Sequence, residues 1–245
     1  MEPSVVSRGE LSSAQDEARE APGLLRGLPI STREAVLRHS VVHSVGAGTV
    51  LFEQGETPNF QHALLSGSIH LFGRSSEARE VLIDVVEPPD LVIPAAVMTA
   101  SPYLVRARVL EPTKLLMLEA RAFRDAVAHD PALAQIVIQS LAGQFRRMVR
   151  QIKNLKLRSS NQRVGCYILA LSRRQGRESV VLPYEKNLIA SELGVTRESF
   201  SRALAALSRE GVVIDGDRIS IVDRGKLEAA CGPDPLIDPD EGPAR

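Results

Sequence analysis

The most regular pattern of apolar positions lies in the middle of the chain, where apolar side chains recur at alternating steps of four and three residues. The positions are Ala134, Ile138, Leu141, Phe145, Met148, Ile152 and Leu155. A strict period of about 3.5 residues is typical of a coiled-coil seam, so it predicts a long helix that pairs with a second copy of the chain. Asp130 and Pro131 supply its N-cap and its first helical residue. The alternative is a long core helix that packs only against its own chain.

Upstream of this helix, short apolar runs alternate with turn residues roughly every ten positions, which is the pattern of a small antiparallel β-roll or jelly roll. Strands are expected over residues 41–45, 49–52, 62–66, 68–72, 81–86, 103–109 and 114–118. A short helix, which begins at Ala122 or Phe123 and ends near His129, should connect this region to the long helix.

Downstream of the long helix, two amphipathic runs are separated by a short turn. The first run ends at Gly194, which suits the left-handed conformation that closes a helix, and Thr196 can cap the second. The apolar positions with helical spacing are Leu188, Ile189, Leu193, Phe200, Leu204 and Leu207. Two helices joined in this way form a helix-turn-helix. The Asp215-Gly216 pair that follows, between alternating apolar residues, predicts a β-hairpin, so we expect a winged helix-turn-helix.

The start of the second helix carries side chains suited to the major groove of DNA. Arg197 and Arg202 can donate to O6 and N7 of guanine, and Glu198 can accept from N4 of cytosine. Ser201 can bond either kind of partner, and Thr196 begins the same helix. We therefore expect these five residues to bind DNA. The alternative is a solvated polar face, which is common on helices of this composition.

The net charge of the chain does not indicate a nucleic-acid partner, because 30 Lys and Arg residues balance 30 Asp and Glu residues. A local patch would have to supply the positive field. Lys186 and Arg218 lie on either side of the second helix in the sequence and are expected to contact phosphates. A dimer formed through the long helix would present two helix-turn-helix units, so double-stranded DNA with an inverted repeat is the expected partner.

Several function classes find no support in the sequence. No apolar run is long enough to span a membrane and no signal-peptide core follows Met1, so a cytoplasmic protein is expected. Cys166 and Cys231 form neither a disulfide framework nor a metal cluster. We find no Ser/His/Asp or Cys/His constellation, no phosphate-cradling Gly-rich loop and no metal-ligand spacing, so an enzyme is not expected.

Together these patterns predict an α+β protein with five segments. They are a disordered N-terminal tail (1–22), a β-roll (23–130), a dimerisation helix (131–158), a winged helix-turn-helix (159–231) and a disordered C-terminal tail (232–245).

Three stretches carry a resemblance to a known family. They are Val50-Leu-Phe-Glu-Gln-Gly-Glu56 with Leu64-Leu-Ser-Gly-Ser-Ile69, the junction Phe123…Asp130-Pro131, and the segment from Gln162-Arg-Val to Leu193-Gly-Val-Thr-Arg-Glu-Ser-Phe-Ser-Arg-Ala-Leu204. In this order they resemble the CRP/FNR family of bacterial transcription regulators, over about 24–230. The last stretch is similar to denitrification regulators and related alphaproteobacterial-type activators. The resemblance implies a cyclic-nucleotide-binding-type β-roll that senses an effector, a homodimer, base reading by Arg197, Glu198, Ser201 and Arg202, and RNA polymerase as a partner.

The chain departs from two sensing modes of that family. Where cyclic-AMP-binding members carry a Gly-Glu pair and an Arg-Ser pair, this chain has Ile93-Pro94 and Tyr103-Leu104. A phosphodiester would lose its charge-assisted hydrogen bonds there, so cyclic nucleotides are not expected to bind. Iron–sulfur members use N-terminal cysteines, and here no cysteine precedes Cys166, which also argues against a cluster.

The effector therefore stays open. A candidate apolar pocket is formed by Val92, Ile93, Ala95, Val97 and Met98, with Tyr103, against the long helix. Haem, a small apolar or redox-active effector, and no effector at all are the three alternatives. Histidines available as haem ligands are His39, His43, His62, His70 and His129. Cys166 is either a buried core residue or a thiol switch. For the whole chain, the alternative to a transcription regulator is a ligand-binding β-roll that acts on a protein partner.

Overall fold

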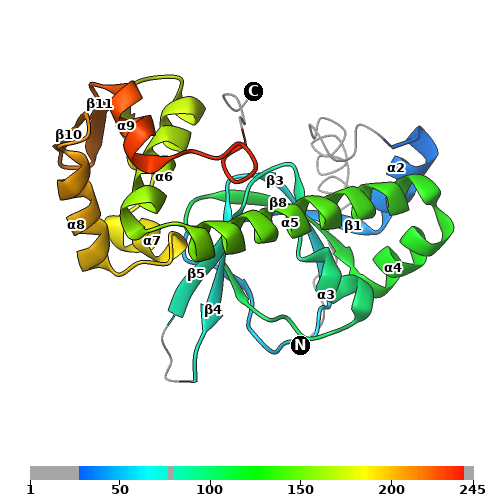
Figure 1. The fold of residues 1–245 in the computed structure, drawn as a ribbon. Coiled ribbons are helices and arrows are strands. Elements are labelled where there is room, and N and C mark those ends of the chain that lie inside the picture. Colours follow the sequence, from blue (N-terminus) through cyan, green and yellow to red (C-terminus); the bar gives the residue numbers. More distant parts are fainter. Residues whose placement is uncertain (1–27, 77–79, 240–245) are drawn as a thin grey trace. The chain divides into compact units, whose positions relative to one another are not determined.

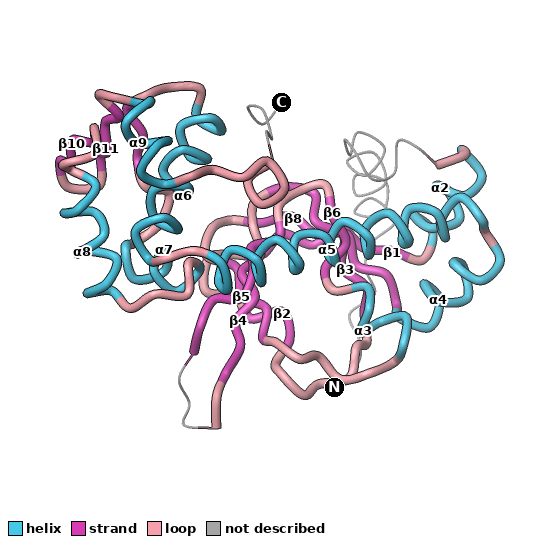
Figure 2. Tube along the Cα trace, in the orientation of Figure 1, coloured by secondary structure: helices cyan, strands magenta, loops and turns pink. Residues whose placement is uncertain are grey.

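The computed structural model describes residues 28–76 and 80–239 (Figures 1 and 2). The chain forms two compact units, residues 1–143 and 144–245, so the division falls within the long helix α5, Pro131–Leu157. The helix predicted over 131–158 is thus present as one continuous element. The predicted N-terminal tail, 1–22, lies outside the described residues.

The first unit contains two antiparallel four-stranded sheets. One sheet has the order β1 (Ser40–Val45), β8 (Thr113–Glu119), β3 (Phe60–Ser66), β6 (Asp90–Val92). The other has the order β2 (Val50–Phe52), β7 (Arg106–Val109), β4 (Ile69–Arg74), β5 (Glu80–Val86). Among the described residues, this unit also contains helices α2 (Ile30–Arg38), α3 (Pro94–Thr99) and α4 (Ala120–His129) and the first half of α5. The β-roll predicted from the alternating pattern is therefore confirmed.

Alternation along the strands gives the first sheet two buried faces. On β3, Leu64 belongs to the apolar cluster inside the roll, whereas the neighbouring Ala63 belongs to a second cluster with Phe123 of α4 and with Leu133 and Val137 of α5. Successive side chains of a strand point to opposite faces, so one face packs inside the roll and the other packs against helices. The first half of α5 is thereby anchored to the roll.

The segment between β6 and β7 differs from the sequence-based prediction. A strand was expected over 103–109, but β7 begins only at Arg106, and helix α3 precedes it. The residues flanking α3, Ile93 and Ala100, both have left-handed backbone conformations, with φ of 43° and 51°. Such conformations are unfavourable for residues other than glycine, so Ile93 and Ala100 do not mark the ends of this helix in the sequence.

The second unit is a winged helix-turn-helix around one core. Its elements are α6 (Ser160–Gln175), β9 (Ser179–Val181), α7 (Lys186–Glu192), α8 (Arg197–Leu207), β10 (Val212–Asp215), β11 (Arg218–Ile221) and α9 (Arg224–Cys231). Strands β10, β11 and β9 form an antiparallel sheet. The core residues Ile168, Ile189, Phe200, Ile219 and Leu227 are fully buried. The α+β class and the winged helix-turn-helix are as predicted, whereas β9 and α9 were not anticipated.

The wing hairpin predicted at Asp215-Gly216 is present as β10 and β11. Asp215 pairs with Arg218 across the hairpin, so the two-residue loop is Gly216-Asp217 rather than Asp215-Gly216. Gly216 has a φ of 59° at the first loop position, where a positive φ favours glycine. The Asp-Gly signal therefore located the hairpin, and the structure gives its register.

Part of the predicted C-terminal tail is ordered. Residues 232–239 fold back from α9, and the carboxylate of Asp238 accepts two hydrogen bonds from the guanidinium of Arg158, in the connection between α5 and α6. Lys153 of α5 also lies 3.6 Å from the carboxylate of Asp234. The prediction of a disordered tail is wrong for these residues, and 240–245 lie outside the described residues.

Candidate nucleic-acid interface

Helix α8, which carries the predicted base-reading residues, is oriented by its apolar side and capped at its start. Thr196 is the N-cap, and its Oγ1 accepts from the backbone N–H of Ser199 at 3.2 Å. The preceding Gly194 has a φ of 63°, as the predicted turn requires. Phe200 and Leu204 are buried in the core of the unit. The opposite side of the first turns therefore faces solvent.

The structure brings the predicted base-reading residues together on that exposed side. Arg197, Glu198, Ser201 and Arg202 are all exposed, and they occupy two successive turns of α8. Backbone hydrogen bonding at Glu198 lowers the pKa of its carboxyl below the ordinary value. The carboxylate is thus ionised at neutral pH and can act only as an acceptor. The arrangement combines two cationic donors with one anionic acceptor.

Lys186, a predicted phosphate contact, lies beside the wing. Its Nζ donates to the carbonyl oxygen of Gly216 at 2.7 Å and lies 3.6 Å from the carboxylate of Asp217. Both partners belong to the loop of the wing, so Lys186 connects helix α7 to the wing. Arg218, at the first residue of β11, is exposed and remains a candidate phosphate contact.

The predicted dimer seam is an exposed apolar stripe on α5. Phe145 is 62% exposed, and Ile138, Met148, Ile152 and Leu155 are also exposed. Ala134 and Leu141 are the exceptions, because both are half-buried, Leu141 against the helix-facing cluster of the β-roll. Leu155 also approaches the helix-turn-helix, since a Cβ at Gly194 would lie 2.5 Å from its Cδ2. Solvated apolar side chains of this size along one helix mark a contact surface.

The predicted effector pocket is not one cluster in the structure. Val92, Ile93 and Tyr103 pack inside the roll, where the ring of Tyr103 stacks on Phe52 with 3.6 Å between centroids. Burial, and secondarily the charge of Glu56, raises the pKa of the Tyr103 hydroxyl to about 12.

Two of the other three pocket residues, Val97 and Met98, belong to the helix-facing cluster with α4 and α5. Both lie on α3, Pro94–Thr99, which the sequence did not predict. Ala95, on the same helix, is exposed. The periodic pattern could not assign these residues to separate clusters, because the division depends on how α3 packs.

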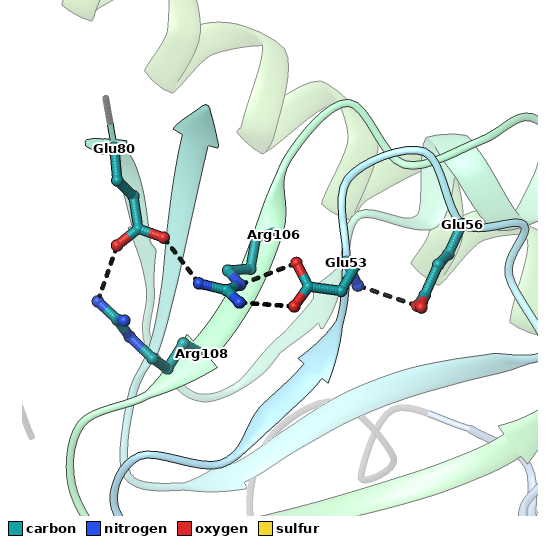
Figure 3. Close-up of polar contacts among 5 residues, drawn as sticks. All are labelled: Glu53, Glu56, Glu80, Arg106 and Arg108. Atoms are coloured by element: carbon teal, nitrogen blue, oxygen red, sulfur yellow. Dashed lines mark hydrogen bonds and ion pairs between the residues drawn. The ribbon is translucent and has the colours of Figure 1, made fainter. Parts of the chain in front are cut away.

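The arginines that follow the segment 94–105 are already paired with carboxylates (Figure 3). Arg106 donates from Nε and Nη2 to both oxygens of Glu53, at 2.9 and 2.6 Å, and from Nη1 to Glu80 at 3.0 Å. Arg108 donates to the other oxygen of Glu80 at 3.2 Å. The Arg106 hydrogen bond lowers the pKa of the Glu53 carboxyl. This network joins the residue after β2 to β5 and β7. It engages the two arginines that follow Tyr103-Leu104, the pair that stands where cyclic-AMP-binding members carry Arg-Ser.

The candidate haem ligands differ in their surroundings. His39, His43 and His129 are exposed, whereas His62 and His70 are buried. Burial lowers the pKa of the His62 imidazole to about 4, so this ring is neutral at physiological pH. Within the described residues, its Nδ1 has no hydrogen-bond partner.

Both cysteines lie in the core of the winged helix-turn-helix unit. Cys166 Sγ donates to the carbonyl oxygen of Cys231 at 3.8 Å. Burial raises the pKa of the Cys166 thiol to about 12 and that of the Cys231 thiol to about 11. Because the thiolate is the reactive form, this environment favours the core-residue interpretation of Cys166 over a thiol switch. In residues 28–76 and 80–239, no group of three or more His, Cys, Asp and Glu side chains could hold a metal ion.

Comparisons with known proteins agree with this architecture. Residues 42–130 match the model of a cyclic nucleotide-binding domain, and residues 162–230 match that of a Crp-like helix-turn-helix domain. The CRP-like cAMP-activated global transcriptional regulator of Mycobacterium tuberculosis is 22% identical over 218 residues, which cover 86% of this chain and 97% of the relative.

Two solved structures are similar over most of the chain. One, from Silicibacter pomeroyi and proposed to be a cAMP-binding regulatory protein, is 27% identical with a TM-score of 0.55, and the match covers 91% of this chain and all of the other. The other, a proposed CRP/FNR-family transcriptional regulator from Eubacterium rectale, is 20% identical with a TM-score of 0.69 and coverages of 87% and 100%.

The β-roll, the long helix and the winged helix-turn-helix, with these matches, define a DNA-binding transcription regulator. The chain belongs to the CRP/FNR family, as the sequence motifs predicted. Among its described helices, none has the length and apolar character that a membrane span requires.

Proposed function

We propose that this protein is a homodimeric regulator that binds an inverted-repeat operator in double-stranded DNA. The observation that carries the proposal is the exposed face of α8. Arg197, Glu198 and Arg202 lie on this face in the first turns of the helix, directly after its N-cap. Two arginines and a carboxylate can recognise a guanine–cytosine step through its major-groove edge. Ser201 contacts a neighbouring thymine or phosphate, and RNA polymerase is the expected protein partner in the cytoplasm.

The exposed apolar stripe of α5 supports the dimer. A monomer would leave Phe145, Met148 and Ile152 in water, whereas a parallel pairing of two α5 helices buries them at a and d positions. A two-fold dimer places its two recognition helices in half-sites one helical turn apart, about 34 Å centre to centre. Arg218 on the wing then contacts the phosphate backbone.

We further propose that the effector is not a cyclic nucleotide, although the Mycobacterium tuberculosis relative is described as cAMP-activated. At the position of the phosphate-binding Arg-Ser pair, Tyr103 is buried against Phe52 and Leu104 is 85% exposed. Arg106 and Arg108 are held by Glu53 and Glu80. A cyclic phosphate would therefore meet an aromatic pair in place of a cation.

The direct test is operator selection. The full-length protein is incubated with a pool of random duplexes, bound DNA is amplified through several rounds, and the enriched sequences are read. The expected result is an inverted repeat with guanine–cytosine pairs in each half-site. Enrichment of no sequence, in the apo protein and in protein purified from its own host with its bound molecules, would contradict the proposed function.

A further inference from the structure

A short chain of hydrogen bonds connects the N-cap of α8 to one of its exposed arginines. The Oγ1 of Thr196 donates to Ser199 Oγ at 3.1 Å and accepts from the Ser199 backbone N–H at 3.2 Å. Ser199 Oγ in turn accepts from Arg202 Nη2 at 3.0 Å. The Ser199 hydroxyl is therefore the link between a fixed helix end and a long exposed side chain.

The position of Ser199 on the helix explains this contact. Residues three apart on a helix are neighbours on its surface, so Ser199 lies one turn before Arg202. Ser199 is half-buried, whereas Arg202 is exposed. An exposed arginine otherwise samples many rotamers, and fixing it on binding has an entropic cost. The bond to Ser199 restricts that sampling before DNA arrives.

We propose that Ser199 is a positioning residue that preorganises Arg202 for a base edge in the major groove. The inference rests on the proposed function, because it assigns a role within the same DNA-binding face. A guanidinium has five N–H donors and Ser199 engages only one, so four remain for O6 and N7 of a guanine. Ser199 thereby raises discrimination at the base pair that Arg202 contacts, without touching that pair itself.

Three substitutions separate the hydroxyl from the shape of the side chain. Ser199→Ala removes the acceptor. Ser199→Thr keeps the hydroxyl and Ser199→Val replaces it by a methyl group of the same shape, and both are β-branched with similar helix propensities. Affinities are measured for the selected operator and for variants with single base-pair changes, by fluorescence anisotropy at fixed salt. Melting temperatures confirm that each variant is folded.

The expected result is a loss of discrimination confined to one position. Ser199→Ala and Ser199→Val should lower affinity for the selected operator roughly threefold to tenfold per half-site, which is the range for one hydrogen bond. Ser199→Thr should retain wild-type discrimination. The operator position affected should be the one that Arg202→Ala affects, and in an Arg202→Ala background Ser199→Ala should change nothing further.

Other outcomes overturn the proposal. An equal loss for all operators that persists in the Arg202→Ala background would make Ser199 a phosphate contact. Unchanged affinity and discrimination in Ser199→Ala would make the hydrogen bond incidental. In both cases the wild-type protein still binds its operator, so the proposed function stands. A wild-type protein that binds no operator would contradict both the proposed function and the positioning role of Ser199.

Discussion

Arg158 and Asp238 form a nearly buried ion pair between residues 80 positions apart in the sequence. Their side chains are 5% and 11% exposed, and two hydrogen bonds join guanidinium to carboxylate. Arg158 also donates to Asn154 Oδ1 at 3.2 Å, and Asp238 accepts from the backbone N–H of Asp234 at 3.0 Å. The C-terminal segment is thereby fastened to the connection between α5 and α6.

Removing one partner should destabilise the DNA-binding unit strongly. Asp238→Ala leaves the Arg158 charge buried beside Asn154, and such a change costs about 3 kcal/mol of unfolding free energy. The measurement is denaturant unfolding of the full chain. Asp217→Ala is the matched control, because its carboxylate is 75% exposed and its ion pair with Lys186 should contribute less than about 1 kcal/mol. Equal losses in the two variants would show that the Arg158–Asp238 pair is not a structural contact.

The same pair should make stability depend on acid pH. Burial by itself raises the pKa of the Asp238 carboxyl, but the hydrogen bonds from Arg158 and from the Asp234 backbone hold it below its ordinary value. A pKa that is lower in the folded state adds stability above the unfolded value, about 4, and that stability is lost as pH falls through the folded value. The difference in unfolding free energy between wild type and Asp238→Asn should shrink as the pH is lowered from about 6 to below 4. A difference that is constant over this range would contradict the assignment.

Charge placed in the α5 seam should break the dimer. Phe145→Asp would bury a carboxylate between two apolar helices, at a cost of several kcal/mol, so monomers that no longer bind a full inverted repeat are expected. Gln139→Asp, which adds the same charge at another exposed position of α5, is the control and should stay dimeric. Light scattering gives the mass of each. A Phe145→Asp protein that remains a dimer would mean that the stripe is not the interface.

Cyclic nucleotides should leave the protein unchanged. Because Tyr103 is stacked on Phe52 and Arg106 is bound to Glu53, millimolar cyclic AMP or cyclic GMP should not raise the melting temperature. A ligand at 100 times its dissociation constant would add about 2.7 kcal/mol, which thermal unfolding resolves easily. A shift of several degrees with either nucleotide, and none with the matching noncyclic monophosphate, would overturn this expectation.

Two arginines of the DNA-binding unit should behave differently in salt and sequence titrations. Arg202→Ala should cost roughly 1–3 kcal/mol per half-site and relax preference at one base pair. Arg218→Ala should weaken binding to all sequences alike and reduce the salt slope by about one. Single-base operator variants titrated at two salt concentrations distinguish the two. An equal loss for every variant in Arg202→Ala would make Arg202 a phosphate contact.

Local signals determined the elements that carry the interface. The strict apolar period predicted α5, because one stripe of one helix encodes it within a few turns. Gly194 and Thr196 predicted the turn and cap of the recognition helix, since a left-handed glycine and an N-cap hydroxyl act on neighbouring backbone groups. The face that exposes Arg197, Glu198 and Arg202 followed from the spacing of the buried residues.

Contacts between distant residues were decided only by the tertiary structure. Lys186 donates a hydrogen bond to the wing loop at Gly216, and Asp238 pairs with Arg158, because packing brings together residues that no periodic pattern relates. The predicted pocket divided between two clusters for the same reason, as α3 carries Val97 to the helix side while Tyr103 turns into the roll. Hydrophobicity marks a side chain as buried, but the element packed against it selects its neighbours.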